Sequence, residues 1–70
     1  MAKKDIREIV GNSVRELREE RGWSQEELGF RSSLHRNYIG GVERGERNIA
    51  IVNLAKLAKA LGVSPKDLLP

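Results

Sequence analysis

The chain has 70 residues, of which none is cysteine and only one, His35, is histidine. The lack of cysteine excludes disulfides, thiolate metal sites and a cysteine nucleophile. A single histidine cannot by itself build a zinc site or activate a serine. The sequence also has no recognisable catalytic pair of carboxylates, no nucleophile beside a base and no phosphate-cradling glycine loop. We therefore expect no enzyme activity, no cofactor and no metal ion.

Long hydrophobic runs are absent as well. The longest apolar run, residues 49–52, has four residues, whereas a transmembrane helix needs about 20. The N-terminus does not look like a secretory signal. These features predict a soluble, cytoplasmic protein with no membrane partner. A chain of this length forms one domain, residues 1–70, and buries only about 60% of the surface that its unfolded form exposes, so we expect modest stability unless a partner adds to it.

Charge is only weakly unbalanced, with 13 lysines and arginines against 10 acids and a net charge of +3. Residues 1–22 are nearly neutral, whereas residues 28–42 contain two arginines and no acid. Arg44 and Arg47 follow, interleaved with acids. Positive charge without compensation therefore lies in the middle of the chain, where it favours a nucleic-acid partner.

Apolar residues recur at helical spacing along the whole chain, and no segment alternates as a strand does. The first predicted helix follows an Asp5 cap and ends at Gly22. The second begins at Ser24, which starts a capping-box pattern with the acid three residues later, and ends near Arg31. Residues 32–34 then form a turn of three residues.

Three more helices complete the prediction. The third begins at His35 and ends near Arg44, followed by a glycine. The fourth carries one apolar face and stops at Gly62, and a last short helix opens with a serine cap and a proline at residues 64–65. Five helices with short connections predict a compact all-α domain.

The two short helices around the turn, over about residues 24–44, form a helix-turn-helix, whose second helix enters the major groove of DNA. In that helix Ile39 and Val42 face one side and are predicted to belong to the core. The opposite side carries Arg36, Asn37, Gly40, Gly41 and Arg44. An ordinary surface helix would fill this side with lysine, glutamate and glutamine.

This opposite side suits the reading of bases. Arg36 can donate two hydrogen bonds to guanine, and Asn37 can pair with adenine. Gly40 and Gly41 each cost about 0.8–1.0 kcal/mol relative to alanine in a helix, a cost that close approach of the helix backbone to DNA would explain. We predict these four as base-reading residues. Tight packing against another helix is the alternative for the glycines, and a solvated helix start is the alternative for the other two.

Contacts to the DNA backbone are predicted around the same two helices. The backbone N–H groups at the start of the second helix, beside Gln25, form a natural phosphate clamp, although Gln25 also fits a plain surface position. Tyr38 fits a half-buried position with its hydroxyl near the DNA backbone. His35 flanks the start of the recognition helix, where a phosphate contact is one interpretation.

Several short motifs occur at matching mutual spacing over residues 6–69. They are SQEEL at 24–28, YI at 38–39, VERG at 42–45, RN at 47–48 and LAKLAKALGV at 54–63. With these motifs the chain resembles the phage repressor and Cro family of helix-turn-helix regulators. Within the family it is similar to short stand-alone regulators, including controller proteins of restriction-modification systems. The resemblance implies a five-helix domain of the lambda-repressor-like DNA-binding type.

The resemblance also implies roles for individual residues. Gln25 would contact phosphate and brace the recognition helix, and Arg18 would form an internal salt bridge with Glu43. The residues that would lie near the DNA backbone after the recognition helix are Arg44, Arg47 and Asn48. The chain departs from the family pattern where Gly29 replaces alanine, Ser33 replaces the turn glycine and residues 49–50 replace Pro-Ser, which leaves the fourth helix without a good N-cap.

The expected function is sequence-specific binding of double-stranded DNA by a homodimeric transcriptional regulator with a partly palindromic operator. We expect no separate oligomerisation domain, and dimer contacts would then come from this domain. We predict them at Ile49, Val52, Leu68 and Leu69, for which ordinary core positions are the alternative, and we place Ile51 in the core. The alternative function is a protein-interaction or antitoxin module with the same fold.

Overall fold

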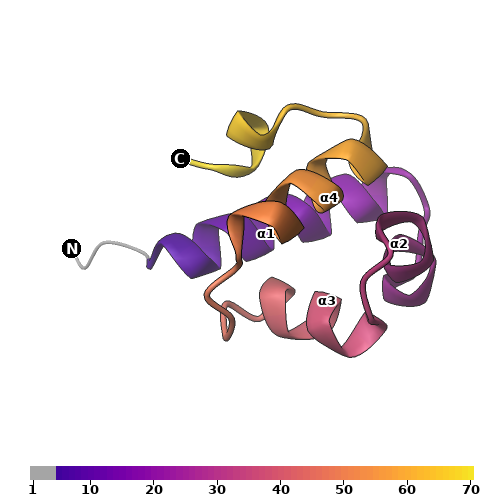
Figure 1. The fold of residues 1–70 in the computed structure, drawn as a ribbon, viewed down its shortest axis with the longest axis horizontal. Helices are drawn as coiled ribbons and strands as arrows, with labels where there is room; N and C mark the ends of the chain where they lie inside the picture. Colours follow the sequence, from indigo (N-terminus) through magenta and orange to yellow (C-terminus); the bar gives the residue numbers. More distant parts are fainter. Residues whose placement is uncertain (1–4) are drawn as a thin grey trace.

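A computed structural model describes residues 5–70, and these residues contain four α-helices and one turn of 3₁₀ helix (Figure 1). The elements are α1 (Ile6–Glu20), α2 (Gln25–Ser32), α3 (Arg36–Glu43), α4 (Ile51–Leu61) and η1 (Pro65–Leu68). The expected five α-helices are therefore four, since the last element has 3₁₀ hydrogen bonds such as Asp67 N to Ser64 O at 2.9 Å. Four residues are too few for a stable α-helix and suit the tighter 3₁₀ form. No helix in residues 5–70 combines the length and the apolar character needed to cross a membrane.

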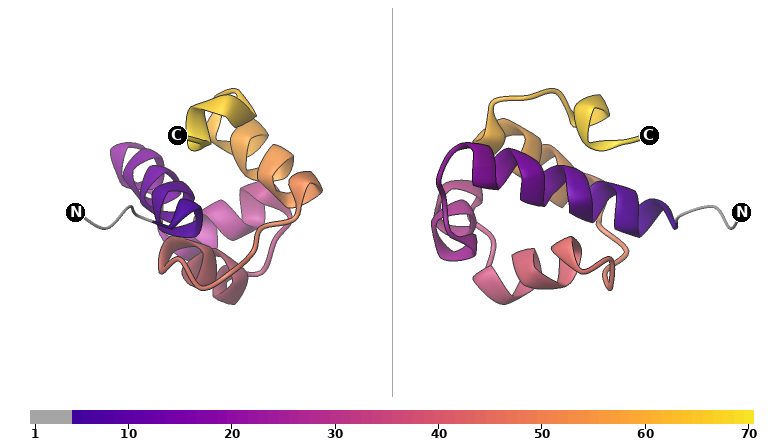
Figure 2. Two further views of the ribbon diagram at one scale, coloured as in Figure 1. Left: turned by 90° about the vertical axis from the view of Figure 1, so that its left-hand side faces the viewer. Right: turned by 180° about the vertical axis from the view of Figure 1, so that it is seen from behind.

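The helices are arranged around one core. In Figures 1 and 2, α1 and α4 lie alongside each other, α2 stands at one end and α3 runs below α1. Helix α3 packs on α1 and α2, while η1 packs on α4 and α1. One side of α3 thus faces the core, and its other side faces away from the body of the protein.

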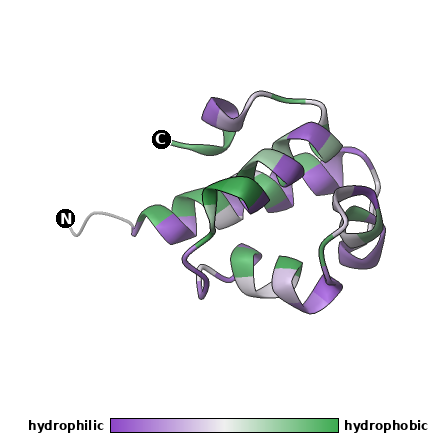
Figure 3. Cartoon of the chain, in the orientation of Figure 1, coloured by the Kyte–Doolittle hydropathy of each residue, from purple (hydrophilic) through white to green (hydrophobic). Residues whose placement is uncertain are grey.

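Every element contributes to the core. Ile39 and Val42 of α3 are buried as the helical pattern predicts, with 0% and 2% of their surfaces exposed. The other buried hydrophobic residues are Val10, Val14, Leu28, Leu54, Leu57, Ala58, Leu61 and Leu68. The hydropathy colouring in Figure 3 shows apolar and polar residues alternating around each helix, as amphipathic helices require when they surround one core.

The helix-turn-helix turn lies one residue later than the sequence pattern predicts. Ser32 stays in α2, where its hydroxyl donates to the Leu28 carbonyl at 2.7 Å. Ser33 then adopts the left-handed conformation, with φ of 62°, at the position where the family usually has glycine. His35 is the N-cap of α3, and its Nδ1 accepts from the Asn37 N–H at 3.0 Å.

Two glycines allow backbones to touch. A Cβ atom on Gly29 would lie 2.6 Å from the Leu34 carbonyl oxygen, so α2 and the turn are packed without a side chain between them. A Cβ atom on Gly11 of α1 would overlap the Val42 carbonyl oxygen and lie 2.9 Å from that of Glu43. The end of α3 is therefore held directly against the backbone of α1.

Candidate nucleic-acid interface

The start of α3 is polar and exposed. Arg36 and Asn37 are both exposed, whereas Ile39 and Val42 of the same helix are buried. They line a hollow of about 280 Å³ together with Gln25, Gly40 and Arg44. The structure thus brings together, across α2 and α3, residues that the sequence assigned to base reading and to backbone contact.

Gly40 and Gly41 are buried by arginine and glutamine side chains. The position of a Cβ on Gly40 lies 3.1 Å from Arg44 Nη1 and 3.3 Å from Gln25 Oε1. The corresponding position on Gly41 lies 3.0 Å from both Cγ and Nε of Arg47. The glycines therefore make room for long side chains that fold across α3, rather than for another helix of this domain.

Arg47 also contacts Tyr38 of α3. The guanidinium carbon of Arg47 lies 5.6 Å from the centre of the Tyr38 ring, within the range of a cation–π contact. Tyr38 is half-buried and Arg47 is exposed. Asn48 is exposed in the loop after α3, and His35 is exposed before it. Long polar side chains thus flank both ends of α3.

A buried ion pair connects the helices that carry the site. The Glu43 carboxylate, with 5% of the residue exposed, accepts from Arg18 Nε at 2.7 Å, Arg18 Nη2 at 2.9 Å and Gln25 Nε2 at 3.0 Å. Arg18 also donates to the Trp23 carbonyl at 2.8 Å. The hydrogen bonds to Glu43 raise the pKa of the Arg18 guanidinium, so the guanidinium stays charged. The network joins α1, the start of α2 and the end of α3, and within residues 5–70 the second N–H of the Gln25 amide has no acceptor.

Arg36 at the start of α3 and Arg44 at its C-cap both have exposed acidic partners. Arg36 Nη1 donates to Glu26 Oε2 at 2.7 Å, and Arg44 Nε donates to Glu46 Oε2 at 3.1 Å. Exposed pairs of this kind contribute little to the stability of the fold. The sequence pattern missed Glu26, because an acid in the first turn of a helix is explained by the helix dipole alone.

A separate apolar surface lies at the start of α4 and near the C-terminal end. Val52, Leu69 and Ile6 are 62%, 40% and 55% exposed, and Ile49 is half-buried. Ile51 is 81% exposed, so its predicted place in the core is wrong. Leu68 is 0% exposed and belongs to the core of the protomer, so it is not available to a partner as expected. Ile51 therefore joins the exposed apolar residues, and Leu68 is removed from them.

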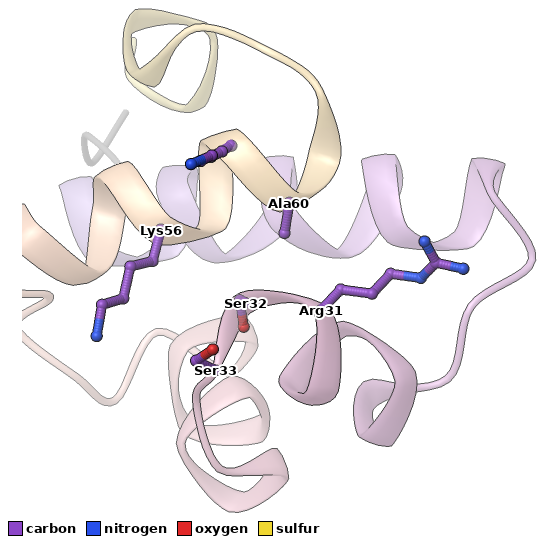
Figure 4. Close-up of a pocket in the computed structure, with 6 residues that line it drawn as sticks. Arg31, Ser32, Ser33, Lys56 and Ala60 are labelled. Carbon is purple, nitrogen blue, oxygen red and sulfur yellow. The ribbon is translucent and has the colours of Figure 1, made fainter.

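A further hollow lies between the end of α2 and α4 (Figure 4). It is lined by Arg31, Ser32, Ser33, Lys56, Lys59 and Ala60. Figure 4 shows the side chains of Arg31 and Lys56 pointing away from each other. Arg31 pairs with Glu27 at 2.7 Å and lies over the Trp23 ring at 4.2 Å. These cations do not converge on a common point, and this hollow is not a candidate site.

Comparisons with known proteins agree with this geometry. Residues 14–68 match the helix-turn-helix family. Control protein C.BamHI of Bacillus amyloliquefaciens is 50% identical over 66 residues, which cover 93% of this chain and 82% of the relative. Control protein C.SmaI of Serratia marcescens is 51% identical over 65 residues, which cover 93% and 77%.

Solved structures give the same result. The restriction-modification controller protein C.AhdI from Aeromonas hydrophila is similar with a TM-score of 0.87 and 51% identity, over 90% of this chain and 96% of that one. The hypothetical transcription factor NHTF from Neisseria is similar with a TM-score of 0.90 and 44% identity, over 94% and 76%. The similarity thus extends over nearly the whole chain and includes both α2 and α3.

Proposed function

The chain belongs to the helix-turn-helix family and is a DNA-binding transcriptional regulator, and we propose that it binds a partly palindromic operator as a homodimer. The observation that carries the proposal is the exposed start of α3, where Arg36 and Asn37 lie beside Gln25 and Arg44. The similarity to control proteins C.BamHI and C.SmaI supports a regulator of the controller type.

The exposed side chains divide naturally into two groups. Arg36 and Asn37 are the long polar side chains at the start of α3, and they are suited to guanine and adenine in the major groove. Gln25 and Arg44 line the same hollow, and Arg47 lies over Gly41. All three are suited to phosphates. The remaining proposed backbone contacts are His35, Tyr38 and Asn48. The two glycines of α3 offer no side chain, so specificity concentrates on the few base pairs next to the start of the helix.

Salt dependence tests DNA binding as the main function. Several phosphate contacts per protomer release counterions, so log affinity should fall linearly and steeply with log salt. Operator sequences are first selected from a random duplex pool, and binding is then titrated by fluorescence anisotropy. We expect a loss of about 10³–10⁵ in affinity between about 50 and 200 mM salt for 6–10 phosphate contacts in a dimer. Affinity that does not change over this range would contradict the proposal and favour a protein-interaction module.

The dimer is proposed from the apolar surface and from the needs of recognition. One domain offers few base contacts, and a second copy doubles them on two half-sites one helical turn apart. Ile51 and Leu69 are exposed and line one hollow together with Ile6 and Ile49. Val52, which follows Ile51 in α4, is also exposed. A second copy of the chain fits this surface, because a two-fold axis pairs each apolar residue with the same patch on its partner.

Replacing Val52 with aspartate tests this interface. The change puts a charge twice into a two-fold interface, so the variant should sediment as a monomer at concentrations where the wild type is a dimer. Its operator affinity should fall, while its circular dichroism spectrum stays helical because Val52 is exposed in the protomer. Phe30→Asp is the matched control, since Phe30 is 83% exposed on α2. A monomeric wild type, or a Val52 variant that stays dimeric, would disprove this interface.

A further inference from the structure

Glu26 connects the two helices of the helix-turn-helix through the residue proposed to read the bases. Its carboxylate oxygen Oε2 accepts from Arg36 Nη1 at 2.7 Å. Glu26 lies in the first turn of α2 and Arg36 in the first turn of α3. The two side chains are 73% and 61% exposed, so neither is required by the core.

An acid at this position opposes DNA binding when its charge is considered alone. The start of α2 is the proposed phosphate-binding end, and a carboxylate there repels phosphate. The dipole of α2 stabilises such a carboxylate, but Glu27 in the same turn offers the dipole the same charge and pairs instead with Arg31. The difference between the two acids is their partner, because only Glu26 holds Arg36.

The hydrogen bond to Glu26 uses only one nitrogen of the Arg36 guanidinium. Only Nη1 donates to Glu26, and within residues 5–70 neither Nε nor Nη2 of Arg36 has a hydrogen-bond acceptor. These two nitrogens form the parallel fork that matches O6 and N7 of guanine. Glu26 can therefore keep its hydrogen bond while Arg36 binds a base.

We propose that Glu26 is a positioning residue that fixes the Arg36 guanidinium for base reading and so sets specificity at that base pair. The proposal rests on the proposed function. A long side chain that is already held loses less conformational freedom on binding. Once DNA covers the pair and excludes water, the attraction between carboxylate and guanidinium also becomes stronger.

The test compares Glu26→Ala with Glu27→Ala, which removes the same charge from the same helical turn. Each is titrated against the selected operator, the operator with the guanine pair replaced, and a scrambled duplex. The ratio of the first two affinities measures discrimination. Glu26→Ala should lower discrimination by about three- to five-fold per half-site and leave binding to scrambled DNA equal or tighter. Glu27→Ala should leave discrimination unchanged. Glu26→Gln, which keeps an acceptor oxygen, should restore part of the loss.

Arg36→Ala and the double variant separate the possible failures. In the Arg36→Ala background, Glu26→Ala should have no further effect on discrimination, because its partner is gone. If Arg36→Ala lowers discrimination and Glu26→Ala alters all three duplexes equally, Glu26 acts only as a charge and this inference is overturned. If Arg36→Ala itself leaves discrimination intact, base reading by Arg36 is disproved and the role of Glu26 is overturned with it.

Discussion

Replacing Arg36 with alanine should cost about 1–3 kcal/mol of operator binding at each half-site, and about twice that for a dimer on both half-sites. The expected loss is large because Arg36 is one of only two long polar side chains at the exposed start of α3. The preference at one base pair should relax, while binding to scrambled DNA should weaken much less. Titration of both duplexes by fluorescence anisotropy measures the difference.

Arg47→Ala is the matched control, since it removes the same charge from the edge of the same surface. A residue that contacts phosphate should weaken all sequences alike and reduce the salt slope by about one unit per contact. Equal weakening of operator and scrambled DNA by Arg36→Ala would show that Arg36 is a backbone anchor. The base-reading role would then have to pass to another residue of α3.

The second large effect is expected in stability. Glu43→Ala leaves the Arg18 guanidinium, with only 12% of its side chain exposed, without its carboxylate, and it also releases Gln25. Removing one partner of a buried ion pair costs about 3–5 kcal/mol. In a domain of this size each kcal/mol shifts the melting temperature by about 4–8 °C. We expect a loss near the lower end of this range, and thus a fall of well over 10 °C in thermal unfolding followed by circular dichroism.

Glu46→Ala serves as the control for Glu43→Ala. Glu46 also pairs with an arginine, Arg44, but its side chain is 59% exposed, and an exposed pair contributes at most about 1 kcal/mol. The control variant should melt close to the wild type. Equal melting temperatures for the two variants would show that the buried pair does not support the fold.

The helices and the core were predictable because their causes are local. Ser24 caps α2, and the spacing of Ile39 and Val42 fixes the inner face of α3. Glycines with positive φ follow α1, α3 and α4 where the sequence indicates helix ends. Each of these features depends on neighbours within one or two turns, which sequence periodicity records directly.

The errors arose where tertiary geometry decides. Ile51 shares a helical face with buried residues of α4, but it stands at the first position of that helix and is exposed. Leu68 is the last residue of η1 and Leu69 follows it, and periodicity does not tell which of two neighbours faces inward. Ser32 stays in α2, where its hydroxyl donates to a carbonyl of its own helix. Serine side chains make local hydrogen bonds in turns as well, so the Ser-Ser pair does not show where the helix ends.

The site could be predicted in its residue types but not in its contacts. The sequence indicates that Gly40 and Gly41 cost helix stability, but only the folded chain shows that Arg44, Gln25 and Arg47 occupy the space. The Glu26–Arg36 hydrogen bond joins two helices across the turn, and no helical spacing of 3 or 4 residues reports such a pair. Contacts that long side chains make between different helices therefore could not be predicted from the sequence.

The backbone contact at Gly11 has a consequence for the architecture of the operator. Where Gly11 meets the end of α3, no side chain separates the two backbones, so at this point the helices have no compressible layer through which one can tilt against the other. Ile6, at the apolar surface proposed for the dimer, lies on the same helix as Gly11. In the proposed dimer the distance and angle between the two reading helices are thus built into the protein. One extra base pair between the half-sites turns one of them by about a tenth of a helical turn, and the DNA, rather than the protein, has to twist to restore the match.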